Sequence, residues 1–163
     1  MGRTTYAIAL GSNRRSRWGS PAAAVRAAAV AIGSERLSQV RATPALGPAG
    51  RSFANAVAIV RSELPPPALL ARLKAVEAEF GRRPGRRWGP RILDLDIILW
   101  SGGRWRDSAI EVPHSAFRKR RFVLEPLAEV APLWRDPVTS LTVRQLLSRQ
   151  AHPRPVDPRS PGT

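Results

Sequence analysis

The chain has 163 residues, of which 43% are hydrophobic, so it can bury a core of its own as one domain of ordinary size. It contains no cysteine, which excludes a disulfide framework, a thiolate metal site and a cysteine nucleophile. Its formal net charge is +15, and all of its 27 basic residues except Lys74 and Lys119 are arginine. Because the guanidinium group holds phosphate oxygens with a planar fork of donors, this composition favours a nucleotide or nucleic-acid partner, with solvated surface charge as the alternative.

The chain shows no signal for a membrane or for secretion. No segment approaches the roughly 18 consecutive apolar residues of a spanning helix. The first residues lack the apolar core of a signal peptide, and Tyr6 stands where a myristoylation motif needs Ser or Thr. We therefore expect a cytoplasmic protein without a membrane partner. Residues 1–149 are expected to form a single domain, and the Pro- and Arg-rich residues 150–163 a disordered tail.

The N-terminal part predicts a strand followed by a helix. The apolar run at residues 5–10 is typical of a short buried strand, and Gly11 is expected to end it. Ser20 is a favourable N-cap residue with Pro21 at the first helical position, and Gly33 suits the position just after a helix. An alanine-rich helix is therefore expected between Ser20 and Gly33.

The middle of the chain predicts two strands, a helix and a further strand. The first two strands are expected at residues 37–43 and 55–61, on either side of a loop rich in Pro and Gly. A helix is expected from Pro66 to Gly81, because four apolar residues fall on one helical face: Leu69, Leu73, Val76 and Phe80. The apolar run at residues 92–100 predicts a central strand.

The C-terminal part predicts a short strand at residues 104–106 and a helix-rich end, with helical spacing at residues 141–147. The whole order is strand, helix, two strands, helix, strand and short helices. This order predicts an α+β sandwich of the ferredoxin-like type, a mainly antiparallel sheet with helices packed on it.

The most informative local pattern is a carboxylate pair in the predicted central strand. Asp94 and Asp96 are two residues apart, so both should point to one face of the sheet, while Leu93, Leu95 and Ile97 face the core. Two carboxylates this close repel each other unless a cation lies beside them. Mg²⁺ is commonly held by one or two carboxylates together with phosphates. The alternative is a solvent-facing pair neutralised by neighbouring arginines.

An arginine-rich segment directly precedes this strand. Residues 82–91 contain five Arg, two Gly, two Pro and Trp88, a composition that predicts a loop. Arginines beside a Mg²⁺-binding carboxylate pair suit phosphoryl transfer, which depends on positioning and charge stabilisation. The P-loop motif is missing, and the Gly11-Ser12-Asn13 run is only a weak phosphate-loop signal that is more often a plain turn.

Three other features could contribute to a site. His114 is followed by the basic run 118–121, and contact with phosphate and a structural role are equally open for it. Phe53, Asn55 and Phe122 could line a flat pocket, since aromatic rings stack on planar ligands and an amide pairs with the edge of a heterocycle. Core packing is the alternative for both Phe residues. Zinc is disfavoured, because the chain has two histidines without helical ligand spacing.

Several motifs together resemble one enzyme family. The run from Arg87 to Ile97, Arg-Trp-Gly-Pro-Arg-Ile-Leu-Asp-Leu-Asp-Ile, resembles the central motif of the 6-hydroxymethyl-7,8-dihydropterin pyrophosphokinase family of folate biosynthesis. Flanking motifs agree in order and spacing, at residues 9–13, 43–48, 53–56, 77–82, 112–114 and 120–127. The resemblance covers residues 5–148. It implies a ferredoxin-like core with loops that close over the substrates.

The resemblance also implies a reaction and its residues. ATP would donate its β,γ-pyrophosphoryl group to the hydroxymethyl oxygen of the pterin, leaving AMP. Two Mg²⁺ ions would lie on Asp94 and Asp96, which with Arg82 and Arg91 would form the catalytic set. The implied ATP-binding residues are Glu77, Arg82, Arg87, Trp88, Arg91, Ile97, His114 and Arg120. The implied pterin-binding residues are Thr43, Pro44, Leu46, Phe53, Asn55 and Phe122.

The chain departs from the family pattern without losing an implied metal ligand or phosphate arginine. Phe53 stands where Tyr is frequent, Lys74 replaces an uncharged polar residue, Ser115 follows the histidine, and Ala109 replaces a basic residue. The arginine-rich loop is also shorter around residues 84–86 than is usual in the family.

Two other classes of function stay open. One is a basic ferredoxin-like RNA-binding domain, which the charge favours and the low aromatic content and missing RNP1 motif disfavour. The other is a degenerate relative that binds ligands without turnover.

The expected partners are ATP and the pterin, with no nucleic acid. A monomer is expected, with a dimer as the alternative.

Overall fold

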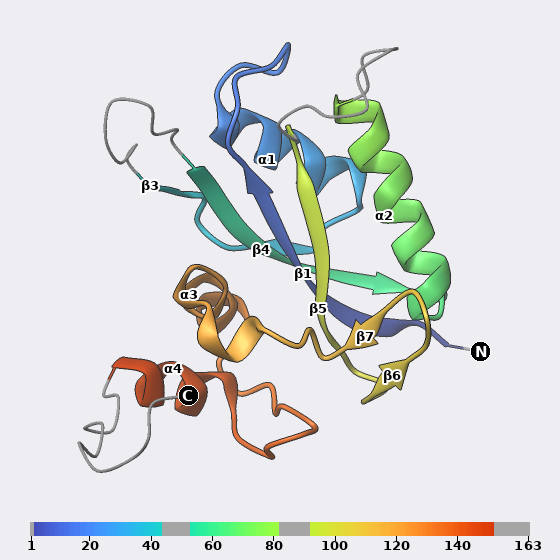
Figure 1. Cartoon of the computed structure of the whole chain (residues 1–163), viewed down its shortest axis with the longest axis vertical. Coiled ribbons are helices and arrows are strands. Elements are labelled where there is room, and N and C mark those ends of the chain that lie inside the picture. The colour runs from blue at the N-terminus through green and yellow to red at the C-terminus, as the bar shows by residue number, and fades with distance from the viewer. Residues whose placement is uncertain (1, 44–52, 82–91, 152–163) are drawn as a thin grey trace, which may run out of the picture.

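The computed structural model describes residues 2–43, 53–81 and 92–151, which form an α+β architecture (Figure 1). The main sheet has five antiparallel strands in the order β2-β4-β1-β5, with β3 also paired to β4. Its strands are β1 (Thr4–Ser12), β2 (Arg36–Leu37), β3 (Arg41–Thr43), β4 (Phe53–Ser62) and β5 (Asp94–Trp100). A separate two-stranded sheet joins β6 (Trp105–Arg106) to β7 (Glu111–Val112).

Helices lie on both faces of the main sheet (Figure 1). The helices α1 (Pro21–Ala31) and α2 (Pro66–Gly81) cover one face, and α3 (Arg121–Val130) and α4 (Val143–Ala151) pack on part of the other. A short 3₁₀ helix, η1 (Phe117–Lys119), leads into α3. The α+β prediction of the ferredoxin-like type is confirmed by this arrangement. The helix α4 reaches Ala151, two residues past the predicted end of the domain.

The signals that predicted α1 and α2 are present in the structure. The Ser20 hydroxyl accepts a hydrogen bond from the Ala23 amide at 3.2 Å, which satisfies one of the free donors at the start of α1. Gly33 follows α1 with φ +74°, a conformation that glycine adopts without steric cost. The four apolar residues that predicted α2 are all buried in its contact with the sheet.

The predicted strand at 37–43 is divided into two. Ser38 is buried between β2 and β3, and its backbone amide donates to the Val57 carbonyl at 2.9 Å. Its hydroxyl also accepts a hydrogen bond from the Val57 amide at 3.0 Å. The side chain therefore takes the place of a backbone acceptor and interrupts the regular ladder, which an apolar pattern does not reveal.

The strand β1 is longer than expected, and β5 contains an irregularity. Gly11 does not end β1, because it still pairs with Asn55 on one side and Asp94 on the other. In β5, Ile97 pairs with Ile8 and Leu99 pairs with Ala7, which leaves Ile98 as an extra residue in the ladder. Ile98 shares the face of Asp94 and Asp96 by alternation, and the bulge turns Leu99 to the same face, so both pack in the core beneath α3 and α4.

Candidate active site

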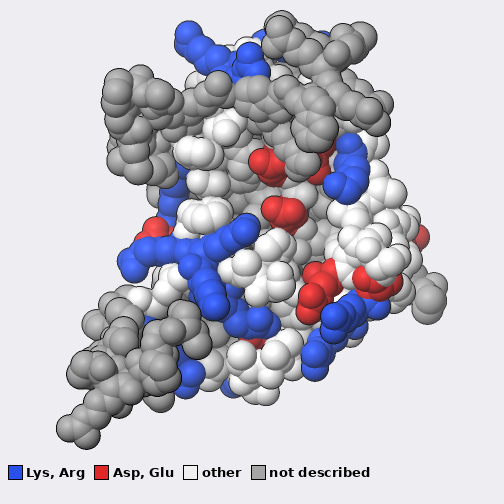
Figure 2. Space-filling view, viewed as in Figure 1, with Lys and Arg blue, Asp and Glu red and all other residues white. Residues whose placement is uncertain are grey.

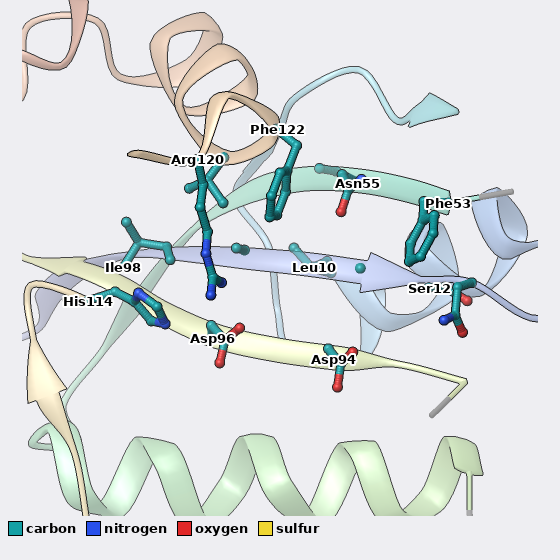
Figure 3. A pocket seen from close by; sticks show the side chains of 15 residues that line it. Leu10, Ser12, Phe53, Asn55, Asp94, Asp96, Ile98, His114, Arg120 and Phe122 are labelled. Atoms are coloured by element: carbon teal, nitrogen blue, oxygen red, sulfur yellow. The ribbon is translucent and has the colours of Figure 1, made fainter. Parts of the chain in front are cut away.

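A cavity of about 500 Å³ opens on the sheet face that α3 and α4 cover only in part (Figure 3). Its floor consists of β4, β1 and β5, and its wall consists of the segment from β7 into α3. The cavity is lined by Ala9, Leu10, Gly11, Ser12, Asn13, Phe53, Asn55, Ala56, Asp94, Asp96, Ile98, His114, Arg120, Phe122 and Val123.

Small residues on the central strand form the middle of the floor. Gly11 lies between Asn55 and Asp94 in the register of the sheet, and Ala9 lies beside Asp96. Neighbouring strands are about 4.8 Å apart, so the backbones of Asn55 and Asp94 are separated by roughly 10 Å. The cavity therefore has two polar sides with little side-chain volume between them.

The first side is the carboxylate pair of β5. Asp94 and Asp96 are exposed on the cavity face, while Leu93, Leu95 and Ile97 are at most 3% exposed on the opposite face. Figure 2 shows acidic side chains in the hollow of this face and basic side chains around it. Among the described residues, no three His, Cys, Asp or Glu side chains lie together in a way that could hold a metal ion by themselves. The pair offers oxygen donors only, which suits Mg²⁺ completed by phosphate and water ligands.

The second side is an amide between two aromatic rings. Phe53 is 47% exposed and Phe122 is 52% exposed, which rules out core packing as the role of either ring. Phe53 and Asn55 are two residues apart on β4 and share its cavity face, and Phe122 projects from the first turn of α3 (Figure 3). Exposed rings on both sides of an amide suit a flat heterocycle with hydrogen-bonding edges.

A network of charges joins β3 to α3, the helix that carries Phe122. Arg41 of β3 donates to Glu125 at 3.1 Å and to Glu129 at 3.3 Å, both on α3. Glu125 also accepts a hydrogen bond from Arg121 within α3, and Glu129 accepts one from the Gln39 amide at 3.0 Å. Because β3 pairs with the start of β4, this network fixes α3 relative to the strand that carries Phe53.

His114 and Arg120 form the wall near the carboxylates (Figure 3). The Nδ1 atom of His114 accepts a hydrogen bond from the Ala116 amide at 3.1 Å, so the neutral ring carries its proton on Nε2. Burial lowers the pKa of His114, Asp96 opposes this shift, and Arg120 adds to it. The ring is therefore an uncharged donor at neutral pH, beside the permanent charge of Arg120.

The comparisons with known proteins agree with this geometry. The sequence model of the 7,8-dihydro-6-hydroxymethylpterin-pyrophosphokinase family matches residues 7–132. The chain belongs to this family. A pyrophosphokinase of Pseudomonas aeruginosa is 40% identical over 139 residues, which cover 80% of this chain and 82% of the relative. The pyrophosphokinase of Synechocystis is also 40% identical, over 71% of this chain. The family named from the sequence motifs is thereby confirmed.

The coverage of the relatives varies. The chain spans 59% of the Synechocystis pyrophosphokinase and 51% of that of Methylorubrum extorquens. The wild-type HPPK-DHPS of Plasmodium falciparum shares the fold, with a TM-score of 0.65 at 11% identity over 90% of this chain and 41% of its own length. Among the described residues, no helix is both long enough and apolar enough to cross a membrane.

The structure brings together part of the site that pyrophosphokinase membership implies. Seven of the implied residues line the cavity: Phe53, Asn55, Asp94, Asp96, His114, Arg120 and Phe122. Thr43 ends β3 beside Phe53 in the register of the sheet. The other implied residues between the described ranges, Pro44, Leu46, Arg82, Arg87, Trp88 and Arg91, lie outside the described part of the chain.

Two implied ATP-binding residues do not line this cavity. The Ile97 side chain is 3% exposed and belongs to the core beneath α1 and α2. Ile98 lines the cavity, because it is two residues from Asp96 and shares its face of β5, while the ATP-binding role implied for Ile97 stays a prediction. Glu77 lies on α2, is half-buried and is absent from the lining of this cavity.

Sequence reasoning missed the lining residues that carry little chemistry of their own. Ala9, Gly11 and Val123 contribute shape, and their place follows only from the register of β1 between β4 and β5 and from the packing of α3 on the sheet. The Gly11-Ser12-Asn13 run was the one available signal, and it suggested a turn rather than a cavity floor.

Proposed function

We propose that this chain transfers the β,γ-pyrophosphoryl group of ATP to the hydroxymethyl group of 6-hydroxymethyl-7,8-dihydropterin, giving AMP and the pterin pyrophosphate. The observation that supports this function best is the two-sided cavity. A slot for a flat heterocycle lies on one side of Gly11, and a carboxylate pair with cationic neighbours lies on the other. Family membership independently supports the same reaction.

The pterin side would bind the acceptor. Phe53 and Phe122 would stack on the two faces of the ring system, and the Asn55 amide would donate to and accept from its edge. Thr43, Pro44 and Leu46 belong to the same proposal through the family motif. This placement directs the hydroxymethyl group across Gly11 towards the carboxylate side.

The carboxylate side would bind the triphosphate. Asp94 and Asp96 would hold two Mg²⁺ ions, and Mg²⁺ bound there would neutralise phosphate charge and polarise the transferred group. Arg120 would donate to phosphate oxygens as a permanent cation, and His114 would donate through Nε2. Arg82, Arg87, Trp88 and Arg91 complete the proposed nucleotide site, with Glu77 and the Ile97 backbone.

The reaction is an in-line displacement at phosphorus. The hydroxymethyl oxygen attacks the β-phosphorus and loses its proton. The bond between the β-phosphorus and the oxygen that bridges to the α-phosphate breaks, and that oxygen leaves with AMP. Negative charge grows on the phosphate oxygens during this step, so fixed donors at Arg120 and His114 stabilise the transition state.

The test is AMP release from ATP and Mg²⁺, with and without the pterin. We expect AMP only when the pterin is present, and a loss of roughly 100-fold or more in Asp94→Ala. Glu35→Ala removes an exposed carboxylate outside the cavity and is the matched control. Release of ADP, or of AMP without pterin, would contradict the proposed reaction.

A further inference from the structure

The cavity wall is tied to the rest of the molecule by an ion pair that does not itself line the cavity. Arg118 of η1 donates to both carboxylate oxygens of Asp136, with Nη2 to Oδ1 at 2.9 Å. The Asp136 side chain is fully buried, and that of Arg118 is 24% exposed. Asp136 also accepts hydrogen bonds from the Val138 amide at 3.0 Å and the Thr139 hydroxyl at 2.8 Å. These two hydrogen bonds hold the carboxylate in place independently of Arg118.

The segment that carries Arg118 also carries both polar residues of the wall. His114 precedes η1, and its carbonyl accepts a hydrogen bond from the Phe117 amide at 3.3 Å. Arg120 follows η1 directly, and its amide donates to the Phe117 carbonyl at 3.2 Å. The Arg120 carbonyl in turn begins the hydrogen bonding of α3. A rotation of η1 would therefore move His114 and Arg120 together.

The His114 amide donates to the Ile98 carbonyl at 3.0 Å, which ties the start of this segment to β5. Beyond this backbone contact, two side chains hold η1, and they constrain it in different ways. Phe117 is fully buried in the core beneath α3 and α4, and this apolar contact has no preferred direction. The fork of Arg118 on the Asp136 carboxylate is directional, because two parallel hydrogen bonds fix the plane of both groups. A three-residue 3₁₀ helix has poor hydrogen-bond geometry of its own. Its orientation thus depends on the ion pair.

We propose that Arg118 is a positioning residue, whose ion pair with Asp136 orients His114 and Arg120 towards the triphosphate. This inference rests on the proposed function, because it assigns that wall to the nucleotide. Arg118 acts through the two wall residues and touches no substrate. The pterin slot is held by a different set of contacts, the Arg41 network between β3 and α3. Loss of the ion pair should therefore affect nucleotide and pterin unequally.

The experiment compares Arg118→Gln, Asp136→Asn and the double variant with the wild-type enzyme. We expect each single variant to lower kcat/KM for ATP roughly 10- to 100-fold, as small displacements of reacting groups do. The dissociation constant of a non-hydrolysable ATP analogue with Mg²⁺ should rise, and that of the pterin should stay within threefold. The double variant should be no worse than the single ones, since both remove one interaction. Arg118→Lys, which keeps the charge, should recover part of the loss.

Two controls separate positioning from loss of stability. Arg121→Gln removes another arginine with an ion pair at the start of α3 and should leave nucleotide binding unchanged. Val25→Ala removes buried volume on the far face of the sheet and lowers the Tm without touching η1. If Asp136→Asn does not fold, Arg118→Gln and Arg118→Lys decide the matter.

Three outcomes would overturn the inference. One is wild-type kcat/KM for ATP in Arg118→Gln, and another is equal weakening of nucleotide and pterin binding. The third is an additive loss in the double variant, which would show that the two residues act separately. If the wild-type protein released no AMP, the proposed function would be rejected. The dissociation constants of the ATP analogue and of the pterin would then still test the positioning role of Arg118.

Discussion

Gly11 lies at the middle of the cavity floor, between Asn55 of β4 and Asp94 of β5. A Cβ atom added at Gly11 would lie 3.3 Å from the Asn55 Oδ1 atom and 3.9 Å from the Ala54 carbonyl oxygen. The first contact is tighter than ordinary van der Waals separation, so the amide would have to move. The role of this glycine is the space that it leaves for Asn55 and for a ligand.

We predict that Gly11→Ala weakens pterin binding by about tenfold, or about 1.4 kcal/mol, because the displaced amide loses one hydrogen bond to the ligand. Nucleotide binding should be nearly unchanged. Titration calorimetry with each ligand measures both effects. Asn55→Ala is the comparison variant and should weaken pterin binding at least as much. If Gly11→Ala bound the pterin with wild-type affinity, a Cβ atom at Gly11 would not displace the Asn55 amide from its ligand, and the prediction would be wrong.

Asp96 allows a second test at the scale of one residue. We predict that Asp96→Ala lowers turnover by roughly 100-fold or more and weakens the Mg²⁺-dependent binding of nucleotide, because one of the two carboxylates proposed to bind the metal is lost. Binding of a non-hydrolysable ATP analogue with and without Mg²⁺ is the measurement. Asp107→Asn, at an exposed carboxylate of the β6–β7 connection, is the control. Unchanged AMP release in Asp96→Ala would exclude this residue as a metal ligand.

At the scale of elements, the turn between α3 and α4 is organised by one buried carboxylate. Burial would raise the pKa of Asp136, but hydrogen bonds from Arg118, the Val138 amide and the Thr139 hydroxyl outweigh it, so the pKa lies below its usual value. The unfolded chain therefore binds a proton at a higher pH than the folded chain. The stabilisation is complete above the ordinary Asp pKa of about 3.9 and declines as the pH falls below it.

We predict that Asp136→Asn lowers the free energy of unfolding at neutral pH by roughly 3 kcal/mol, because Arg118 loses its buried partner. The variant should also lose less stability than the wild type between about pH 4 and pH 2, since the titrating group is gone. Urea unfolding at a series of pH values tests both statements. Parallel pH profiles for the two proteins would contradict the assignment of the acid sensitivity to Asp136.

At the scale of the whole molecule, the net charge of +15 is distributed over many elements. Around the hollow in Figure 2, basic side chains surround acidic ones. Several arginines are also bound to carboxylates, as Arg41, Arg118 and Arg121 show. A nucleic-acid backbone laid across this face would meet Asp94 and Asp96 at its centre.

We predict that RNA binds weakly and without relation to the active site. The affinity should fall steeply between 50 and 200 mM salt, as the release of counterions requires. Addition of Mg²⁺ and ATP should displace no more RNA than a salt solution of the same ionic strength does. Fluorescence anisotropy with a labelled oligonucleotide is the measurement. Tight RNA binding at 200 mM salt that is lost when ATP is added would favour the RNA-binding alternative.

The monomeric state and the cytoplasmic location stay predictions, and light scattering tests the first.

The sequence by itself determined most of the elements and indicated which residue types carry the proposed chemistry. The spacing of Leu69, Leu73, Val76 and Phe80 determined a helix and its buried face, because helical geometry depends only on local spacing. The alternation around Asp94 and Asp96 likewise determined which side chains face the cavity. The family motif then indicated the reaction that we propose, which no periodicity could have supplied.

Only the tertiary structure decided how the strands are paired, which small residues form the cavity floor and which contacts hold the cavity wall. The bulge in β5 depends on the pairing of β5 with β1, so the alternation around Asp94 and Asp96 could not reveal that Leu99 shares the face of Ile98. The place of Gly11 between Asn55 and Asp94 depends on three strands distant in sequence. The Arg118–Asp136 pair likewise joins segments 18 residues apart. Such contacts follow from the packing of whole elements against each other, and no local pattern of residue types encodes that packing.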